Sequence, residues 1–312
     1  MPPRPRFRNA ALIYNPAAGF WKRFRQRQLE RALDYLTACG IRCERLATTG
    51  PNHATELARQ QVAAGRDLII ACGGDGTVNE VANGLAGTDV PMAVLPAGTG
   101  NLLATAIGLP WSIWRAAEYI PRGVVRRIAL GRAGTRYFVS MAGAGFDGHG
   151  VERINRLGPL RFKFIRATLE VYRELWLYDF PAFEVHIGNE VYSATQLILG
   201  RVKYFALPVT PRADLFGDDF EVCLITRHRP LHFILYPLVA ILRTLEFFPE
   251  VRYLRARQVR AVPRQGRVLV EADAENAGEL PMEFEIVPEA LSLLVPEKLA
   301  PPTAGQAQQW TT

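Results

Sequence analysis

Two glycine-rich segments of this sequence carry the residue types that bind phosphate groups. The first, Gly73-Gly74-Asp75-Gly76-Thr77, follows an apolar run, and the second, Pro96–Asn101, follows another. Glycines let the backbone turn tightly and bring its N–H groups close to an anion. The N-terminus of a following helix adds a dipole that favours phosphate. A tight turn with an aspartate helix cap remains the structural alternative for the first segment taken alone, but two such segments in succession favour a phosphate site.

A third segment, Asn15-Pro16-Ala17-Ala18-Gly19, also follows a short apolar run. All three segments stand between a predicted strand and a predicted helix. In an open α/β sheet, ligands bind at the carboxyl ends of the strands, so we expect the three loops to converge at one edge. No GK[ST] follows the glycines, and no GxGxxG fingerprint is present. The binding mode is therefore neither that of P-loop NTPases nor that of a dinucleotide-binding Rossmann site.

The elements that position these loops follow from the spacing of apolar residues. Apolar runs predict strands at residues 10–14, 41–47, 67–72 and 92–95, and helical spacing predicts helices over about 25–38, 53–64, 78–85 and 101–107. This alternation predicts an α/β domain, a parallel sheet with helices on both faces.

Beyond residue 123 the pattern changes to alternating apolar and polar residues. It predicts strands at 125–130, 136–141, 183–187, 191–199, 220–226, 253–262, 267–272 and 282–287. Gly188-Asn189 is a strong hairpin signal. This second region is predicted to be a β-rich domain, an antiparallel sandwich or barrel, with helical inserts near 159–177 and 231–248.

Composition excludes several classes of protein. The chain has 312 residues, a formal net charge of +7 and a calculated pI of about 9.4, which favours anionic partners. No nucleic-acid module and no run of five like charges occurs, so nucleic acid is not an expected partner. The four cysteines form no CxxC pair, which indicates reduced thiols rather than a zinc site. The longest apolar stretch is broken by Pro237, Arg243 and Glu246, so we expect no membrane span.

Three motifs in order, NPAAG, GGDGTVNEVANGL and LPAGTGN, closely resemble the catalytic domain of diacylglycerol and sphingosine kinases, including bacterial lipid kinases. Two later segments extend the resemblance: Gly143–Asp147 resembles a GxGFD segment, and Asp273-Ala274-Glu275 stands where the family normally has Asp-Gly-Glu, ahead of ALSLLVP. The resemblance covers roughly residues 9 to 296. It implies an enzyme that uses ATP and Mg²⁺ to phosphorylate the hydroxyl of a lipid such as diacylglycerol or a sphingoid base.

The resemblance also implies domains and roles. Residues 1–124 would bind the nucleotide, residues 125–289 would bind the lipid, a strand at about 290–296 can return to the first domain, and 297–312 would be a flexible tail. Asp75, Glu275 and Asp273 would be catalytic, with Glu275 as proton acceptor, and Asp75 would orient Mg²⁺ with ATP or act on the attacking hydroxyl. Asp147 and Asn101 would bind substrate, and Asp218 would hold a structural Mg²⁺. The nucleotide would be bound by Asn15, Pro16, Ala17, Ala18, Gly19, Thr48, Gly73, Gly74, Asp75, Gly76, Thr77, Val78, Asn79, Gly98 and Thr99.

Two positions depart from the family pattern. Ala274 replaces the middle glycine of the Asp-Gly-Glu triplet, and it would strain the turn if that position needs a positive φ. Gly217-Asp218-Asp219 is a shifted form of the Asp-Gly pair at which relatives can hold the structural metal ion.

Phosphoryl transfer needs an acceptor near the incoming hydroxyl. An Asp-x-Glu pair on a strand would project both carboxylates to one face.

The lipid implies contact with a membrane. Aromatic and basic residues mix in Arg161–Tyr178 and in Leu231–Phe248, and such segments can lie at a headgroup boundary, although aromatic helical stripes more often belong to a core. We expect a cytoplasmic protein, peripheral on the inner face of the membrane, and leave a homodimer open.

Two alternatives to a lipid kinase remain. A kinase for a soluble substrate, of NAD-kinase type, shares GGDGT but places Asn-Glu much further along. A non-catalytic lipid- or nucleotide-binding homologue would explain Ala274.

Overall fold

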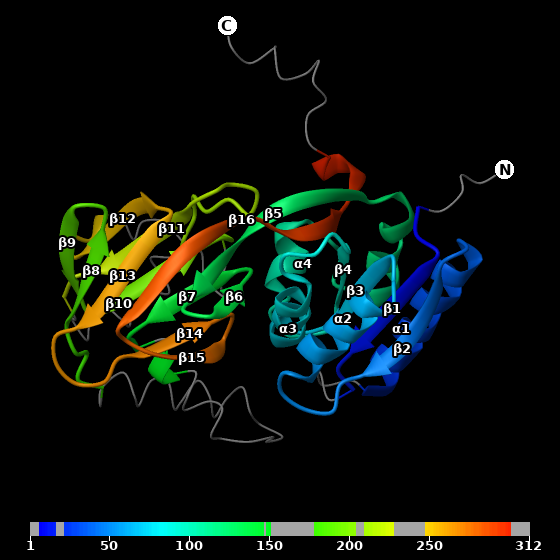
Figure 1. Ribbon diagram of the computed structural model, residues 1–312, viewed down its shortest axis with the longest axis horizontal. Coiled ribbons are helices and arrows are strands. Elements are labelled where there is room, and N and C mark those ends of the chain that lie inside the picture. The colour runs from blue at the N-terminus through cyan, green and yellow to red at the C-terminus, as the bar shows by residue number, and fades with distance from the viewer. Residues whose placement is uncertain are drawn as a thin grey trace, which may run out of the picture. The chain divides into compact units, whose positions relative to one another are not determined.

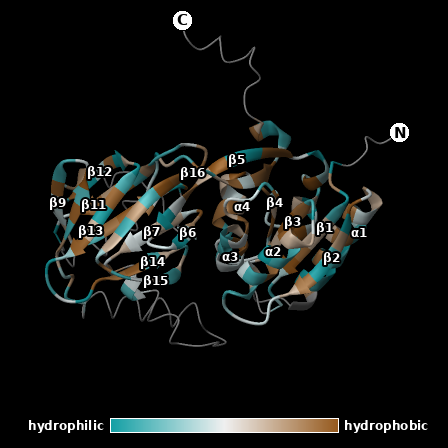
Figure 2. Ribbon diagram, viewed as in Figure 1, coloured by the Kyte–Doolittle hydropathy of each residue, from teal (hydrophilic) through white to brown (hydrophobic). Residues whose placement is uncertain are grey.

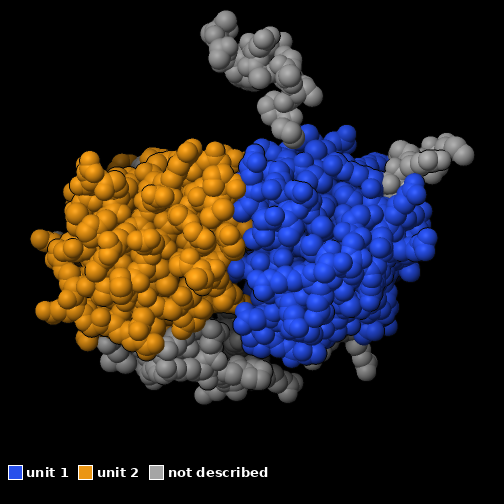
Figure 3. Space-filling view, in the orientation of Figure 1, with its two compact units in different colours: residues 1–128, 289–312 blue, residues 129–288 orange. Residues whose placement is uncertain are grey.

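The computed structural model describes residues 6–16, 22–146, 148–150, 178–203, 209–227 and 247–300. Two compact units are present, one of residues 1–128 with 289–312 and one of residues 129–288 (Figure 3). Several predictions fall outside the described residues. These are Ala17, Ala18, Gly19 and Asp147, most of the two helical inserts and the tail after residue 300.

Unit 1 is a parallel sheet of five strands covered by helices (Figure 1). Its strands are β1 (Asn9–Tyr14), β2 (Arg42–Ala47), β3 (Leu68–Gly73), β4 (Met92–Pro96) and the last part of β16 (Met282–Val295). Its helices are α1 (Lys22–Ala38), α2 (His53–Ala63), α3 (Asp75–Leu85), α4 (Leu102–Ala106) and α5 (Ile113–Ala117), and single 3₁₀ turns occur at Ile120–Arg122 and Glu297–Leu299. Every residue of β3 and β4 is buried, as expected for a parallel strand covered on both faces (Figure 2). The predicted α/β fold is confirmed, and α5 is an element that the spacing did not predict.

The strand order creates a crevice at the carboxyl edge of this sheet. The order is β2-β1-β3-β4-β16, and β1 pairs in parallel with both β2 and β3. The chain thus moves one way from β1 to β2 and the other way from β3 to β4. Right-handed crossovers in opposite directions place their helices on opposite faces, and α1 accordingly packs with α5 while α2 packs with α3. The switch point lies between β1 and β3, where open α/β sheets bind ligands.

Unit 2 consists of two antiparallel layers. One layer contains β7 (Met141–Ala144), β10 (Gln196–Gly200), β11 (Phe220–Ile225), β12 (Val251–Ala256), β14 (Leu269–Ala272) and β15 (Glu275–Glu279), in the order β12-β11-β10-β7-β14-β15. The other contains β6 (Arg136–Phe138), β5 (Val124–Ala133), the first part of β16, β13 (Gln258–Pro263), β8 (Phe183–Ile187) and β9 (Glu190–Ala194), in the order β6-β5-β16-β13-β8-β9. This confirms the predicted β-rich region.

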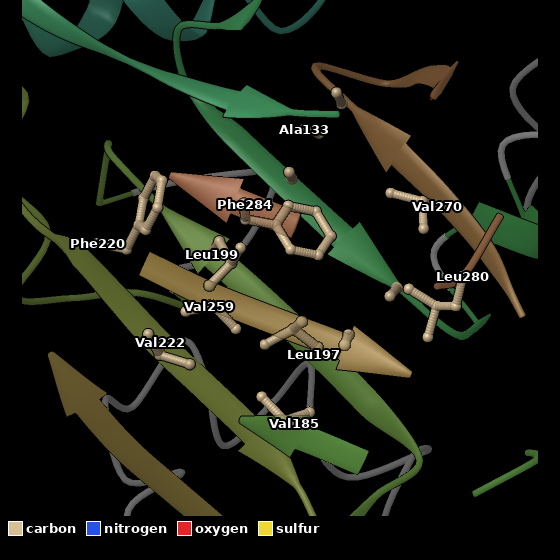
Figure 4. Packing of buried hydrophobic residues seen from close by; sticks show 14 of the residues in the cluster. Ala133, Val185, Leu197, Leu199, Phe220, Val222, Val259, Val270, Leu280 and Phe284 are labelled. Carbon is tan, nitrogen blue, oxygen red and sulfur yellow. The ribbon is translucent and has the colours of Figure 1, made fainter. Parts of the chain in front are cut away.

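The core of unit 2 lies between the two layers. Figure 4 shows Val259 and Phe284 from one layer beside Leu197, Leu199 and Phe220 from the other, and all five side chains are buried. Such interdigitation of alternate residues from facing sheets is the packing of a β-sandwich.

Two segments that were predicted as single strands are each two strands in different layers. Residues 191–199 divide at Thr195 into β9 and β10, and residues 253–262 divide at Arg257 into β12 and β13. The residues that pack into the core shift by one position at each break, from Tyr192 and Ala194 to Leu197 and Leu199, and from Leu254 and Ala256 to Val259 and Ala261. The predicted single strands were therefore wrong, and a bend that moves the chain between sheets replaces each of them.

Candidate active site

The two glycine-rich loops touch each other at the carboxyl edge of β3 and β4. A Cβ atom added at Gly98 would lie 2.4 Å from the Cα of Gly74, and one added at Gly73 would lie 2.4 Å from the Cβ of Thr77. The N–H of Ala97 also donates to the carbonyl of Gly73 at 2.9 Å. Side chains do not fit at either position, because Gly98 lies against the backbone of Gly74 and Gly73 lies against the side chain of Thr77.

Asp75 ties the first loop to the second. Its carboxylate accepts the N–H of Asn101 at 3.0 Å and the N–H of Leu102 at 2.6 Å, so it caps the N-terminus of α4 from the first turn of α3. Burial raises the pKa of Asp75, and these backbone N–H groups oppose that rise. A Cβ atom at Gly100 would lie 2.7 Å from Asp75 Oδ2. The carboxylate therefore holds the two glycine-rich loops in register.

The second loop is braced from inside by Asn101. This residue has a positive φ of 50° and is 5% exposed. Its Oδ1 accepts the N–H of Gly98 at 2.8 Å, and its Nδ2 donates to the carbonyl of Gly98 at 3.1 Å. The predicted contact of Asn101 with substrate stays a prediction, and these contacts give the residue a role in shaping the loop.

A cavity of about 260 Å³ lies where these loops meet the end of β1. It is lined by Tyr14, Asn15, Pro16, Arg25, Gln26, Leu29, Arg45, Cys72, Ala97 and Ile113. These residues come from the carboxyl ends of β1, β3 and β4, from β2, and from α1 and the start of α5. The cavity thus opens at the switch point of the sheet. Burial raises the pKa of the Cys72 thiol to about 12, so this wall of the cavity is neutral.

Two arginines face this cavity, and the sequence did not single out either of them. Arg25 donates from Nη2 to the carbonyl of Gly98 at 3.3 Å, while its Nη1 is buried without a hydrogen-bond partner in the described part of the chain. Burial lowers the pKa of Arg25. The guanidinium of Arg45 lies 5.5 Å from the centre of the Tyr14 ring. Two cations beside glycine loops give the cavity the charge that an anionic ligand needs.

Other predicted nucleotide residues surround the same edge. The N–H of Thr48 donates to the carbonyl of Tyr14 at 2.9 Å, which fixes Thr48 beside the end of β1. Gly76 and Thr77 lie in the first turn of α3, and Thr99 is exposed in the second loop. Val78 and Asn79 are buried within α3, 5% and 1% exposed, so any contact that they make with a ligand would come from the backbone.

A buried glutamate that sequence reasoning overlooked positions α2. Glu80 is 8% exposed, and its carboxylate accepts the N–H of Asn52 at 3.0 Å and the N–H of Ala54 at 2.9 Å. It therefore caps the N-terminus of α2 from the middle of α3. Glu80 lies on the side of α3 away from Val78, Val81, Ala82 and Leu85, so the spacing of apolar residues gave no sign that it is buried.

In unit 2, Asp273 lies in a tight turn and Glu275 follows it directly. Asp273 and Ala274 connect β14 to β15 with positive φ values of 50° and 62°, and Glu275 begins β15. Two consecutive positive φ values define the two-residue hairpin turn that favours glycine. The structure therefore places Ala274 in the conformation for which the family pattern has glycine.

The prediction that a strand projects the two carboxylates to one face is wrong, because Asp273 lies in the turn and points inward. Asp273 is 2% exposed, and its carboxylate accepts the N–H groups of Val139, Ser140 and Met141 at 2.6, 2.9 and 3.0 Å. These three hydrogen bonds use the carboxylate of Asp273 to anchor the turn.

Glu275 has a partner that the sequence did not indicate. Its Oε2 accepts a hydrogen bond from Nη2 of Arg136, which lies in β6, and its side chain is 31% exposed. The arginine holds the carboxylate in one orientation while leaving part of it accessible. Of the two carboxylates in the triplet, Glu275 is the one available to a ligand.

Asp218 lies in a loop whose carbonyl groups bind an arginine. Its side chain is 60% exposed, with Oδ2 at 3.7 Å from Nη2 of Arg257. The fully buried Arg201 instead donates to the carbonyl groups of Asp214, Leu215, Gly217, Asp219 and Ala129 at 2.7 to 3.4 Å. Within the described ranges no cluster of three or more His, Cys, Asp or Glu side chains could hold a metal ion. The structural Mg²⁺ at Asp218 stays a prediction, and among the described residues no such cluster surrounds Asp218.

Comparison with known proteins adds to this geometry. Residues 9–133 match the family model of the diacylglycerol kinase catalytic domain, and residues 140–295 match that of the YegS C-terminal NAD kinase beta sandwich-like domain. Diacylglycerol kinase of Mycobacterium tuberculosis strain H37Rv is 32% identical over 258 residues, 78% of this chain and 81% of the relative. The chain belongs to the diacylglycerol kinase family.

Other members of the diacylglycerol kinase family match nearly the whole chain. Diacylglycerol kinase of Bacillus subtilis strain 168 is 28% identical over 94% of this chain and 98% of its own length. A crystal structure of a diacylglycerol kinase from Bacillus anthracis strain Sterne superposes with a TM-score of 0.73 at 21% identity, covering 94% of this chain and 98% of that one. At that identity the structural match supports the fold alone. No helix in the described ranges of this family member has the length and apolar character needed to cross a bilayer.

Proposed function

We propose that this protein transfers the γ-phosphate of ATP to the hydroxyl group of a lipid alcohol such as diacylglycerol. The observation that carries the proposal is the contact of two glycine turns, Gly73–Thr77 and Gly98–Gly100, at the carboxyl ends of β3 and β4, next to the switch point of the sheet. Beside them lies a cavity with Arg25 and Arg45 on its wall. Backbone N–H groups, a helix N-terminus and two cations together suit a polyphosphate.

The residues present also fit a nucleotide that brings Mg²⁺ with it. Mg²⁺ is usually held by one or two carboxylates together with the substrate phosphates and water, rather than by a cage of protein ligands. Asp75 is the carboxylate at this edge, and it retains acceptor capacity beyond its two backbone contacts. When bound, the metal ion neutralises charge on the transferring phosphate.

The chain's own residues would then position the reactants. The loops at Asn15–Pro16, Gly73–Thr77 and Gly98–Thr99 would orient the phosphates, and Asp75 would keep two of these loops in register. We propose Glu275 as the group that accepts the proton of the lipid hydroxyl, since its carboxylate is partly accessible. Asp273 would act as a positioning residue that presents Glu275, because its own carboxylate is occupied by three N–H groups.

The test is transfer of radiolabel from ATP to a total-lipid extract, with the labelled product identified by mass spectrometry. We expect a labelled lipid phosphate with the wild type and none with Glu275→Gln. NAD in place of lipid tests the soluble-substrate alternative suggested by the shared GGDGT loop. A wild type that labels NAD and no lipid, or that labels nothing across a broad lipid panel while still binding ATP, would overturn the proposal.

A further inference from the structure

One arginine of unit 2 is buried among backbone carbonyl groups. Arg201 follows β10, and its side chain is fully buried. Both terminal nitrogens of its guanidinium donate to carbonyl oxygens, most of them in the loop that precedes β11. Nη1 donates to Gly217, Asp219 and Asp214 at 2.7, 3.2 and 3.4 Å, and Nη2 donates to Leu215 and Ala129 at 2.8 and 3.0 Å. Five carbonyl dipoles thus turn their negative ends towards one buried group.

Converging carbonyl oxygens are ligands for a cation. They coordinate Ca²⁺ in protein loops, and they equally accept the N–H groups of a guanidinium. The loop adds the negative charges of Asp214, Asp218 and Asp219. Burial lowers the pKa of Arg201 to about 10, and these three charges oppose the decrease, so the guanidinium is charged at neutral pH. The loop therefore surrounds a cation, and that cation is part of the chain.

The residues of this loop do not fit the structural Mg²⁺ that the family resemblance implies at Asp218. Mg²⁺ demands oxygen ligands at about 2.0–2.1 Å in an octahedral arrangement, and carboxylates usually supply some of them. The carbonyl groups of the loop already contact a guanidinium, and a metal ion cannot occupy the same space. The three carboxylates also have other partners. Asp214 Oδ1 accepts the N–H of Phe216 at 3.0 Å, Asp219 Oδ1 accepts a hydrogen bond from Nη1 of Arg255 at 2.7 Å, and Asp218 Oδ2 lies 3.7 Å from Nη2 of Arg257.

We propose that the guanidinium of Arg201 is the structural cation of this loop and takes the place of a metal ion there. It connects three parts of the sandwich: β10, which Arg201 follows, the loop before β11, and β5 in the facing layer, which contains Ala129. A metal ion stabilises a fold by an amount that depends on its free concentration. A cation fixed to the chain is present at any metal concentration, so unit 2 should keep its stability without metal.

This inference goes beyond the proposed function and does not depend on it. If the protein phosphorylates a lipid, any Mg²⁺ that the reaction requires would come with ATP. A chelator would then stop the reaction without weakening unit 2. If the protein has no kinase activity, the role of Arg201 in the fold is unchanged, and the experiment below still tests it.

The test is the melting temperature of the full chain without nucleotide, measured in EDTA, in millimolar MgCl₂ and in millimolar CaCl₂, for the wild type and Asp218→Asn. We expect the change from EDTA to either salt to be the same in both proteins. A structural ion at Asp218, in excess of its dissociation constant, would raise the melting temperature of the wild type by several degrees more than that of Asp218→Asn. Comparing the two proteins cancels the effect of any metal ion bound elsewhere.

That larger increase in the wild type would overturn the inference. Elemental analysis of the purified proteins gives a second measurement, in which stoichiometric Mg²⁺ or Ca²⁺ present in the wild type and missing from Asp218→Asn would also overturn it. We expect the metal content of the two proteins to be equal.

Substitutions of Arg201 test its charge. Arg201→Met keeps a long apolar side chain and removes the cation, whereas Arg201→Lys keeps the charge with fewer donors. Arg257→Met, at a side chain that is 71% exposed, is the matched control and should melt close to the wild type. We expect the melting temperature to decrease from the wild type to Arg201→Lys and further to Arg201→Met, in EDTA and in MgCl₂ alike. An Arg201→Met protein as stable as Arg201→Lys would overturn the inference. If neither variant folds, the comparison of the wild type with Asp218→Asn decides by itself.

Discussion

The Oδ1 atom of Asp75 lies 2.6 Å from the backbone nitrogen of Leu102, although 27 residues separate the two along the chain. One carboxylate thus fixes the start of α4 against the start of α3. Any substitution of Asp75 will act on the geometry of both glycine loops as well as on the Mg²⁺ site that we propose there, and the two effects have to be separated by experiment.

The pH dependence of stability isolates the structural effect of Asp75, because it is measured without a metal ion. Burial raises the pKa of Asp75. A carboxyl group with a raised folded-state pKa adds stability below its unfolded pKa and loses it as the pH rises through the folded value. We therefore expect the unfolding free energy of the wild type, relative to Asp75→Asn, to increase as the pH falls from neutral into the acid range. Denaturant titrations at several pH values measure it, with exposed Asp34→Asn as control. A difference that is flat or decreases would contradict the burial argument.

Arg25 should contribute to nucleotide affinity through charge. Its Nη1 is buried beside the cavity while Nη2 holds Gly98. Loss of a charge-assisted contact of this kind costs about 1.5–3 kcal/mol, so Arg25→Gln should weaken ATP binding by roughly tenfold or more. Calorimetry with ATP and with adenosine makes the distinction, because adenosine carries no phosphate and should bind equally to both proteins. Equal loss for both ligands would instead indicate damage to the loop.

Asp273 and Glu275 should separate into a stability residue and an activity residue. Asp273→Asn removes charge from an acceptor of three N–H groups, so we expect it to lower the unfolding free energy by about 1–3 kcal/mol. Glu275→Gln keeps the side-chain shape and should abolish lipid phosphorylation while changing the melting temperature little. Thermal melts and radiolabel assays on both variants decide the assignment. An active Glu275→Gln protein would remove Glu275 from the reaction.

Ala274→Gly should stabilise the fold. An L-residue other than glycine in the left-handed region costs about 1–2 kcal/mol, partly offset by the greater freedom that glycine gives the unfolded chain. A net gain of about 0.5–1 kcal/mol is expected, read as a higher denaturation midpoint with an unchanged m-value. The control is Ala64→Gly at the C-cap of α2, where φ is −77° and no gain is expected. A lower midpoint for Ala274→Gly would show that the turn does not need the left-handed conformation.

Arg201 should be among the residues most sensitive to substitution in unit 2. Its buried guanidinium donates to five carbonyl groups, and burial lowers its pKa to about 10. The carbonyl of Asp214 also accepts the N–H of Gly217, but Arg201→Met would remove a donor from all five carbonyls, at about 1–3 kcal/mol for each one left buried without a partner. We expect a loss of about 3 kcal/mol or more in unfolding free energy. Arg257→Met, at a side chain that is 71% exposed, is the matched control and should be nearly neutral.

The glycine loops and their supporting strands were predictable from the sequence, because both depend on short-range patterns. A buried strand that runs into glycines limits the local backbone to a few arrangements, and the observed bounds of β1 to β4 differ from the predicted ones by at most one residue. The carboxyl-edge location of the loops then follows from parallel pairing alone.

Long-range partners were not predictable in the same way. Arg136 and Glu275 lie 139 residues apart, and no spacing in the chain relates them. The breaks at Thr195 and Arg257 show in the sequence only as a one-residue shift of the core-facing positions, which is a weak signal in strands this short. Arg25 stands in a helix with many basic residues, and its contact with Gly98 is what distinguishes it from its neighbours.

Strand β16 has a consequence for how the chain is made. Its last residues pair with β4, Leu293 beside Met92, so the first sheet needs a strand that is synthesised about two hundred residues later. A ribosome-bound chain that ends before Glu289 has all of the second unit's sequence but leaves β4 as an unprotected edge. Unit 1 therefore cannot complete its sheet until the C-terminal strand has been made, and shortening the protein from its C-terminus into that strand should destabilise unit 1 before the sandwich.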